Sequence, residues 1–191
     1  MVQSLKFTET PLAGAYIVEL EKRSDDRGFF ARCFCVREFA ALGLDSGIVQ
    51  INNSLSSTAG TLRGIHFQLP PKAETKMVRC LKGSFYDVIV DLRPESPTFL
   101  KWFGITLSAE NRLMLYVPKR FGHGFLTLEK NTETLYFVTE FYAPKYERGI
   151  RWDDPRVGID WPITPTEISP RDRSHRVFDL AYHCGPVDPA S

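Results

Sequence analysis

Short apolar runs recur along most of the chain and are separated by clusters of Gly, Pro, Asn and Ser. Runs of this length between turn-forming residues are typical of β-strands. We therefore expect strands near residues 15–20, 29–36, 48–54, 62–68, 76–81, 84–92, 103–108, 113–118 and 134–142. Only residues 37–44 (REFAALGL) show a spacing that indicates a helix.

The order of these elements predicts the fold class. Many strands with no helix between most of them, and no repeated segment, favour an all-β fold: an antiparallel double sheet of jelly-roll type, or cupin-like barrel, with short helices. After Ala143 the chain becomes rich in Pro and charge, with irregularly spaced apolar residues. We expect one domain over residues 1–191, with a barrel core at about 15–142 and an ordered, loop-like covering segment at about 143–191.

The run SFYDVIVDL carries an unusual carboxylate. Strand alternation places Phe85, Asp87 and Ile89 on one face and only apolar residues on the other. A carboxylate among apolar side chains is costly unless it is paired or faces water. Asp87 is therefore expected either to line a ligand site inside the barrel or to sit at its rim.

Composition and charge narrow the functional classes. The 191 residues are 43% hydrophobic and 25% charged, which excludes a disordered or collagen-like chain. The net charge of +1 gives no overall field for nucleic-acid binding. No apolar run approaches the roughly 20 residues of a membrane span, and the N-terminal residues do not resemble a signal peptide, so we expect a cytoplasmic protein without membrane contact.

The four cysteines give no sign of a metal or disulfide framework. Cys33, Cys35, Cys80 and Cys184 form no CxxC pair. On the strand expected at 29–36, Cys33 and Cys35 would share one face and pack as small apolar residues. We interpret all four as free thiols.

Residues 61–80 concentrate polar groups on two expected strands, with Arg63, His66, Gln68 and Lys76 among apolar neighbours. Strict alternation would send Arg63 and His66 to opposite faces, so both reach one site only if Gly64 permits a bulge. A metal cupin needs an HxH pair, whereas His66 precedes Phe and Gln and only His123 could be a second ligand. We therefore expect neither a metal nor another cofactor.

The remaining inventory suits proton transfer beside a carbonyl. Histidine is a base at neutral pH, and Tyr136 and Tyr142 are acid candidates. Arg27, Arg63 and Lys76 could stabilise a phosphate or an enolate.

Nine motifs in one order also carry a family resemblance: DDRGFF (25–30), QINNSLSS (50–57), GTLRGIHFQLPP (60–71), the Lys76 segment, GSFYDVIVDLRPESPTF (83–99), VPKRFGHGF (117–125), the tyrosine pair, WDDPRVGIDWP (152–162) and SPRD (169–172). Together they resemble the dTDP-4-dehydrorhamnose 3,5-epimerase family. The resemblance implies a homodimeric jelly roll that epimerises a nucleotide-diphosphate 4-keto-6-deoxyhexose in deoxysugar biosynthesis, at C3 alone or at C3 and C5, through an enolate.

The resemblance also implies roles for individual residues. His66 matches the catalytic base and Asp172 the acid paired with it, Tyr136 the proton donor on the opposite face of the sugar, and Lys76 the cation near the C4 oxygen. Matches to substrate-binding positions are Arg63, Asp87, His123, Tyr142 and Arg171 in the pocket, Gln50 and Asn52 near the nucleotide, and Arg27 and Phe30 offered by the partner subunit.

Arg32 departs from the family pattern, which commonly has Glu two residues after the phenylalanines of DDRGFF. If Arg32 lies beside the nucleobase of the substrate, a cation in place of Glu changes which edge of the nucleobase can be hydrogen-bonded. Alternatively, Arg32 points to solvent or pairs with phosphate. The nucleotide, whether dTDP, CDP or GDP, stays open at this point.

Three other functions are compatible with a small barrel of this kind. One is a nucleotide-sugar 3,4-ketoisomerase, but that enzyme would not need His66, Asp172 and Tyr136 arranged on both faces of the sugar. A non-catalytic sugar-binding cupin would not need the complete set of acid, base and cation. A metal-dependent oxygenase would need the ligands that the histidine spacing lacks.

Overall fold

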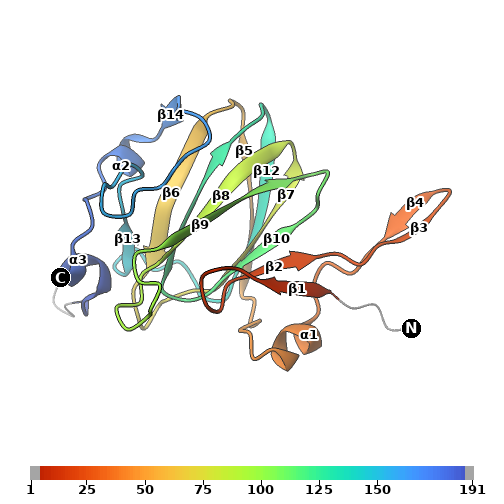
Figure 1. Ribbon diagram of the computed structural model, residues 1–191, viewed down its shortest axis with the longest axis horizontal. Coiled ribbons are helices and arrows are strands. Elements are labelled where there is room, and N and C mark those ends of the chain that lie inside the picture. The colour runs from red at the N-terminus through yellow and green to blue at the C-terminus, as the bar shows by residue number, and fades with distance from the viewer. Residues whose placement is uncertain (1–4, 188–191) are drawn as a thin grey trace.

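Two antiparallel sheets face each other in the computed structural model, which describes residues 5–187 (Figure 1). The first sheet contains, in spatial order, β1 (Lys6–Glu9), β2 (Tyr16–Glu19), β10 (Met114–Val117), β7 (Lys76–Lys82), β12 (Thr132–Val138) and β5 (Gln50–Ser56). The second contains β13 (Glu147–Gly149), β6 (Thr61–Gln68), β11 (Phe121–Thr127), β8 (Ser84–Asp91) and β9 (Trp102–Ser108), with β14 (Glu167–Ile168) pairing in parallel with β6. The expected antiparallel double sheet is confirmed.

The space between the sheets is filled by side chains from both. Val78 and Leu115 of the first sheet pack in one buried cluster with Phe85, Ile89 and Phe125 of the second. Several strands that follow each other in sequence, such as β5 and β6 or β6 and β7, lie in different sheets, so the chain passes repeatedly from one sheet to the other. Burial of these apolar side chains is the main force that holds the two sheets together.

The alternation expected for β8 is confirmed. Phe85 and Ile89 belong to the core between the sheets, whereas Val90 and Leu92 pack in a separate cluster under the C-terminal segment. Both faces of β8 are therefore buried. Asp87 lies on the inner face and is wholly buried, so the rim position is excluded.

Two local predictions were wrong. The strand expected at 29–36 ends early, at β4 (Gly28–Phe30), and α1 (Val36–Ala41) follows a non-strand segment that contains Cys33 and Cys35. Those two cysteines therefore do not share a strand face. Strand β11 went unpredicted because Gly122 and Gly124 interrupt its apolar pattern.

These glycines are required by close packing between strands. A Cβ at Gly122 or Gly124 would lie 2.6 Å from Ile65 side-chain atoms of the neighbouring strand. In β11, therefore, close contact with Ile65 of β6 requires glycine at these two positions, although glycine has a low strand propensity.

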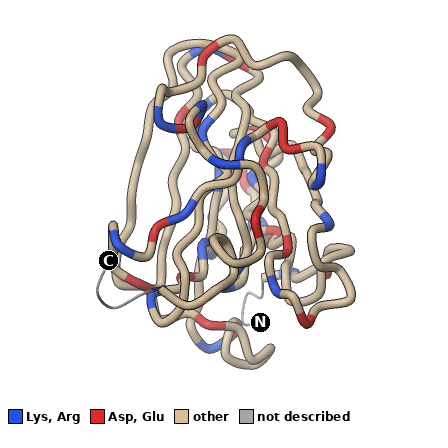
Figure 2. The backbone as a smooth tube through the Cα atoms, turned by 90° about the vertical axis from the view of Figure 1, so that its left-hand side faces the viewer, with Lys and Arg blue, Asp and Glu red and all other residues tan. Residues whose placement is uncertain are grey.

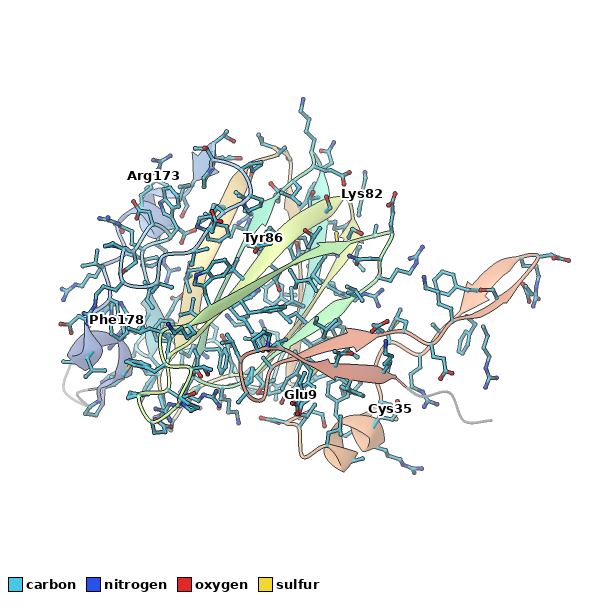
Figure 3. The ribbon with its side chains drawn as sticks, in the orientation of Figure 1. Glu9, Cys35, Lys82, Tyr86, Arg173 and Phe178 are labelled. Atoms are coloured by element: carbon cyan, nitrogen blue, oxygen red, sulfur yellow. The ribbon has the colours of Figure 1, made fainter. Side chains whose placement is uncertain are left out.

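The C-terminal segment covers the outer side of the second sheet. Ile150 and Val157 pack with Phe178 against Val90 of that sheet. The segment includes β13, β14, α2 (Pro170–Arg173) and α3 (Leu180–Cys184), so it is more regular than the loop expected from sequence. Figure 3 labels Arg173 and Phe178 on this side of the molecule, away from Cys35.

A two-stranded hairpin of β3 (Arg23–Asp25) and β4 projects from the body of the barrel (Figure 1). Phe29 contacts the guanidinium of Arg112 at 4.7 Å from the ring centroid, whereas Phe30 is 69% exposed. The hairpin therefore presents an aromatic side chain to its surroundings.

No helix among residues 5–187 is long and apolar enough to cross a membrane. Lys and Arg are interspersed with Asp and Glu along the backbone in Figure 2.

A bulge at Gly64 resolves the conflict between Arg63 and His66. His66 is opposite His123 while Arg63 is opposite Phe125, so between these pairs β6 has two residues where β11 has one. Gly64 has φ +127°, and a Cβ there would lie 2.5 Å from Cα of Gly124. The bulge turns Arg63 and His66 toward the same cavity, as the sequence predicted.

We predict that Gly64→Ala lowers the free energy of unfolding by about 3 kcal/mol, because it combines an unfavourable φ with backbone overlap. Gly28→Ala is the matched control, since Gly28 also has φ +127° but has nothing within 4 Å of an added Cβ. It should cost about 1 kcal/mol. Urea unfolding measures both values, and equal losses would show that contact with Gly124 is unimportant.

Candidate active site

Two adjoining cavities lie where the sheets open beside the C-terminal segment. Their volumes are about 520 and 340 Å³, and His66, Lys76 and Tyr136 line both. His66 comes from β6 in the second sheet, whereas Lys76 and Tyr136 come from β7 and β12 in the first. A ligand in this space would contact side chains of both sheets.

A short hydrogen bond joins His66 to Asp172. The distance from Nε2 of His66 to Oδ1 of Asp172 is 2.6 Å, although 106 positions separate the residues. The other carboxylate oxygen accepts the backbone N–H of Gly64 at 3.5 Å. The carboxylate thus favours the His66 tautomer that is protonated on Nε2 and leaves Nδ1 available to accept a proton.

Helix α2 positions Asp172. Ser169 caps the helix by accepting the backbone N–H of Asp172 at 3.0 Å, and Pro170 occupies its first turn. The Asp172 side chain is only 5% exposed. Burial alone would raise the pKa of Asp172, but interactions with His175 and His66 outweigh it and hold that pKa well below its usual range.

A second histidine–carboxylate pair lies on the neighbouring strands. His123 lines the larger cavity, and its Nε2 is 2.7 Å from Oδ1 of Asp87. Burial raises the pKa of Asp87, with His123 opposing that shift. In the described part of the chain Asp87 lines neither cavity, so it faces the site through His123.

Lys76 is held at the junction of the cavities. Its ammonium lies 3.1 Å from Oε1 of Glu74, and it donates to the backbone carbonyl of His66 at 3.4 Å. Both charged side chains are only 12% exposed. This places a cation next to the strand that carries His66.

Tyr136 lies on the opposite sheet from His66. Burial and the nearby Glu74 raise the pKa of the Tyr136 phenol, and Arg63 partly opposes them. The hydroxyl therefore stays protonated at neutral pH and can act as a proton donor.

The remaining polar groups extend the site along the cavities. Gln50 donates to Asn52 at 2.7 Å, and both line the smaller cavity. Tyr142 lines the same cavity and donates to Glu147 at 2.6 Å. Arg171 lines the larger cavity and forms an ion pair with Glu147.

Besides Asp87, three more predicted substrate-binding residues lie outside the cavities. Among the described residues, Arg27, Phe30 and Arg32 line neither cavity. Arg27 pairs with Asp25 on the projecting hairpin, while Arg32 forms an ion pair with Glu38 of α1. Within one chain, therefore, a carboxylate of α1 engages the Arg32 guanidinium.

Sequence analysis missed His175, Glu74 and Glu147. His175 lies three residues after Asp172, but it follows the end of α2 at Arg173, so helical spacing would not have paired the two residues. Glu74 is two residues before Lys76, close enough in sequence to suggest its ion pair. Glu147 had no local signal, because its partners Tyr142 and Arg171 meet it only in the folded chain.

His66, Asp172 and His175 also have the composition of a metal site, with ligand atoms within 4.8 Å of one another. Two ligands of one tetrahedral zinc ion lie roughly 3.3 Å apart, given bonds of about 2.0–2.1 Å. The 2.6 Å between His66 and Asp172 is shorter and fits a hydrogen bond. The cluster is therefore better described as a proton-transfer group.

Comparison with known proteins identifies the family. The family model described as dTDP-4-dehydrorhamnose 3,5-epimerase matches residues 9–179. The chain belongs to this epimerase family. The Escherichia coli K12 dTDP-4-dehydrorhamnose 3,5-epimerase is 44% identical over 173 residues, covering 90% of this chain and 92% of the relative.

Solved structures agree with this membership of the epimerase family. The Legionella pneumophila dTDP-6-deoxy-D-glucose-3,5-epimerase, in complex with dTDP-4-keto-L-rhamnose, has a TM-score of 0.85 and 36% identity, covering 91% of this chain and 92% of that one. A 3'-monoepimerase from Streptomyces bikiniensis, in complex with dTDP-quinovose, has a TM-score of 0.81 and 33% identity, covering 90% and 86%. The resemblance found in the sequence motifs is confirmed.

We predict that Tyr136 ionises at a higher pH than an unperturbed phenol, because its pKa is raised by burial and by Glu74. In an alkaline absorbance titration, native protein minus Tyr136→Phe should give the signal of one tyrosinate that appears above the pH at which an unperturbed phenol ionises. If that signal appears below pH 10, burial does not control the Tyr136 phenol.

Proposed function

We propose that this chain epimerises a nucleotide-diphosphate 4-keto-6-deoxyhexose, at C3 alone or at C3 and C5. The supporting observation is the placement of a base, His66, and an acid, Tyr136, on different sheets around shared cavity space. Epimerisation needs a proton to leave one face of the sugar and another to arrive on the opposite face. The sugar would lie between the two residues.

The first step is proton abstraction next to the C4 carbonyl. Nδ1 of His66 takes the proton, and the C–H electron pair moves into the ring to form an enolate on the C4 oxygen. Asp172 stabilises the resulting imidazolium through Nε2. Lys76 stabilises the negative charge on oxygen, where a cation is worth most in the transition state.

The second step returns a proton to the opposite face. Tyr136 gives its phenolic proton to the carbanionic carbon, the C4 carbonyl re-forms, and the configuration is inverted. The tyrosinate and the imidazolium then return to their starting states by exchanging protons with solvent. The raised pKa of Tyr136 ensures that the donor form is present at the start.

The nucleotide diphosphate would extend from the sugar toward polar groups at the edges of the site. Arg63 and Arg171 are cations on the larger cavity, and Gln50 and Asn52 offer amides on the smaller one. Guanidinium groups suit phosphate because they present two parallel donors.

We further propose that the active protein is a homodimer. Edge strand β5 of the described chain exposes Ile51 and Leu55, at 56% and 55%, and a second copy would cover them. The projecting hairpin carries Arg27 and Phe30 away from its own cavities. We propose that the partner's site receives them, with Arg27 on the diphosphate and Phe30 stacked on the base.

We predict that His66→Ala abolishes solvent exchange at the sugar. In D2O, the native protein should incorporate deuterium at C3, or at C3 and C5, and NMR of the product identifies the carbon. A general base contributes about 10²–10⁴-fold in rate. Testing dTDP-, CDP- and GDP-linked sugars in parallel shows which nucleobase the protein prefers. Undiminished exchange in the variant would assign the base to another residue.

We predict that two inactive variants restore each other. A mixture of His66→Ala and Arg27→Ala subunits should regain activity, because each heterodimer then contains one site with both residues intact. The control mixes His66→Ala with Asp172→Asn, which removes two residues of the same proposed site and should restore nothing. Failure of the first mixture after proven subunit exchange would contradict a shared site.

A further inference from the structure

Asp172 faces two imidazoles. Besides His66 at 2.6 Å, Nε2 of His175 lies 3.4 Å from the same Oδ1 oxygen. The His175 Nε2 atom is buried and has no hydrogen-bond partner among residues 5–187. A buried imidazole nitrogen without a hydrogen-bond partner is costly unless it interacts with a nearby charge, and the Asp172 carboxylate is close enough to do so.

The His175 ring occupies a defined position. A Cβ on Gly149 would lie 2.3 Å from both Nε2 and Cε1 of His175, so the ring packs on bare backbone. Gly149 is itself opposite His66 in the pairing of β13 with β6. The His66 and His175 rings meet edge to face, with centroids 5.5 Å apart and an interplanar angle of 80°. The strand pair therefore holds both imidazoles around one carboxylate.

We propose that His175 is a positioning residue that shares the Asp172 carboxylate with His66 and thereby weakens the hold of that carboxylate on protonated His66. The proposal rests on the proposed function, in which His66 is the base. Its effect would be to keep His66 neutral, and thus able to take a proton, at a lower pH than a two-residue pair would allow.

Both charge states of His175 act in the same direction. When neutral, His175 is expected to direct Nε2–H at Asp172, because an unprotonated nitrogen would repel the carboxylate. That dipole reduces the negative potential at His66. When protonated, His175 repels the positive charge of His66 directly. The lowered pKa of Asp172, in which His175 is the leading stabilising contact, agrees with this geometry.

Other titratable groups face the same space. The basic side chains that line the two cavities with His66 are those of Arg63, Lys76, His123 and Arg171. The acidic and phenolic groups are Glu74, Glu140, Glu147, Glu167, Tyr136 and Tyr142. All of them remain when His175 alone is replaced, so a difference in the His66 pKa between the native protein and a His175 variant is due to His175.

The experiment compares His175→Phe with His175→Gln. Phe keeps a planar ring of similar size but removes the N–H, whereas Gln keeps an N–H donor without an ionisable ring. The pKa of His66 is measured by NMR titration of histidine-labelled protein without substrate, and His66→Asn identifies the His66 signal. We expect Phe to raise the His66 pKa by about half a unit or more. Gln should hold it near the native value.

Gly149→Ala provides a second route to the same result. Its added methyl group should displace the His175 ring without removing any titratable group, and should raise the His66 pKa as Phe does. This variant tests the proposal if His175→Phe does not fold. An unchanged His66 pKa in both variants, or equal shifts for Phe and Gln, would overturn the proposal.

The acidic limb of kcat/KM should move with the NMR value. A shift in the His66 pKa that the kinetics do not follow would contradict His66 as base and so the proposed function. Kinetics with a normal acidic limb in His175→Phe, together with an unchanged His66 pKa, would remove the role of His175 and leave the proposed function intact.

Discussion

The structure of the site depends on the need to pair a buried carboxylate. Asp172 is almost fully enclosed, and an isolated charge there would be strongly unfavourable. His66 and the Gly64 backbone supply its hydrogen bonds. This requirement ties α2, near the end of the described chain, to strand β6 of the second sheet. The covering segment thereby becomes part of the site as well as part of the core.

The same arrangement recurs one strand away. His66 and His123 are directly opposite each other on β6 and β11, and each imidazole has a carboxylate behind it. Asp172 comes from the covering segment, whereas Asp87 comes from the core of the second sheet. The two histidines are thus held by carboxylates from two different elements, the covering segment and β8. Their rings are oriented before any ligand arrives, which lowers the cost of organising the site for reaction.

The proposed base and the proposed acid lie on different sheets. The base and its carboxylate belong to the second sheet and its cover, while Tyr136 and Lys76 belong to the first. The apolar core between the sheets fixes their separation, so the distance between base and acid depends on packing far from the cavity. The projecting hairpin lies outside this rigid unit, consistent with a role toward a second subunit.

The sequence by itself determined the fold class, the alternation along β8 and the residues that could carry chemistry, because these depend on local periodicity and side-chain type. Its motif order also determined the family. It misjudged the chain after Phe30 and missed β11, where packing against Ile65 requires the glycines that local propensity opposes. Only the tertiary structure decided that Asp87 faces the site through His123, that Glu38 engages Arg32 and that His175 joins Asp172. Each of these depends on burial and on partners from other elements, and a carboxylate's partner is chosen by which elements the core brings together.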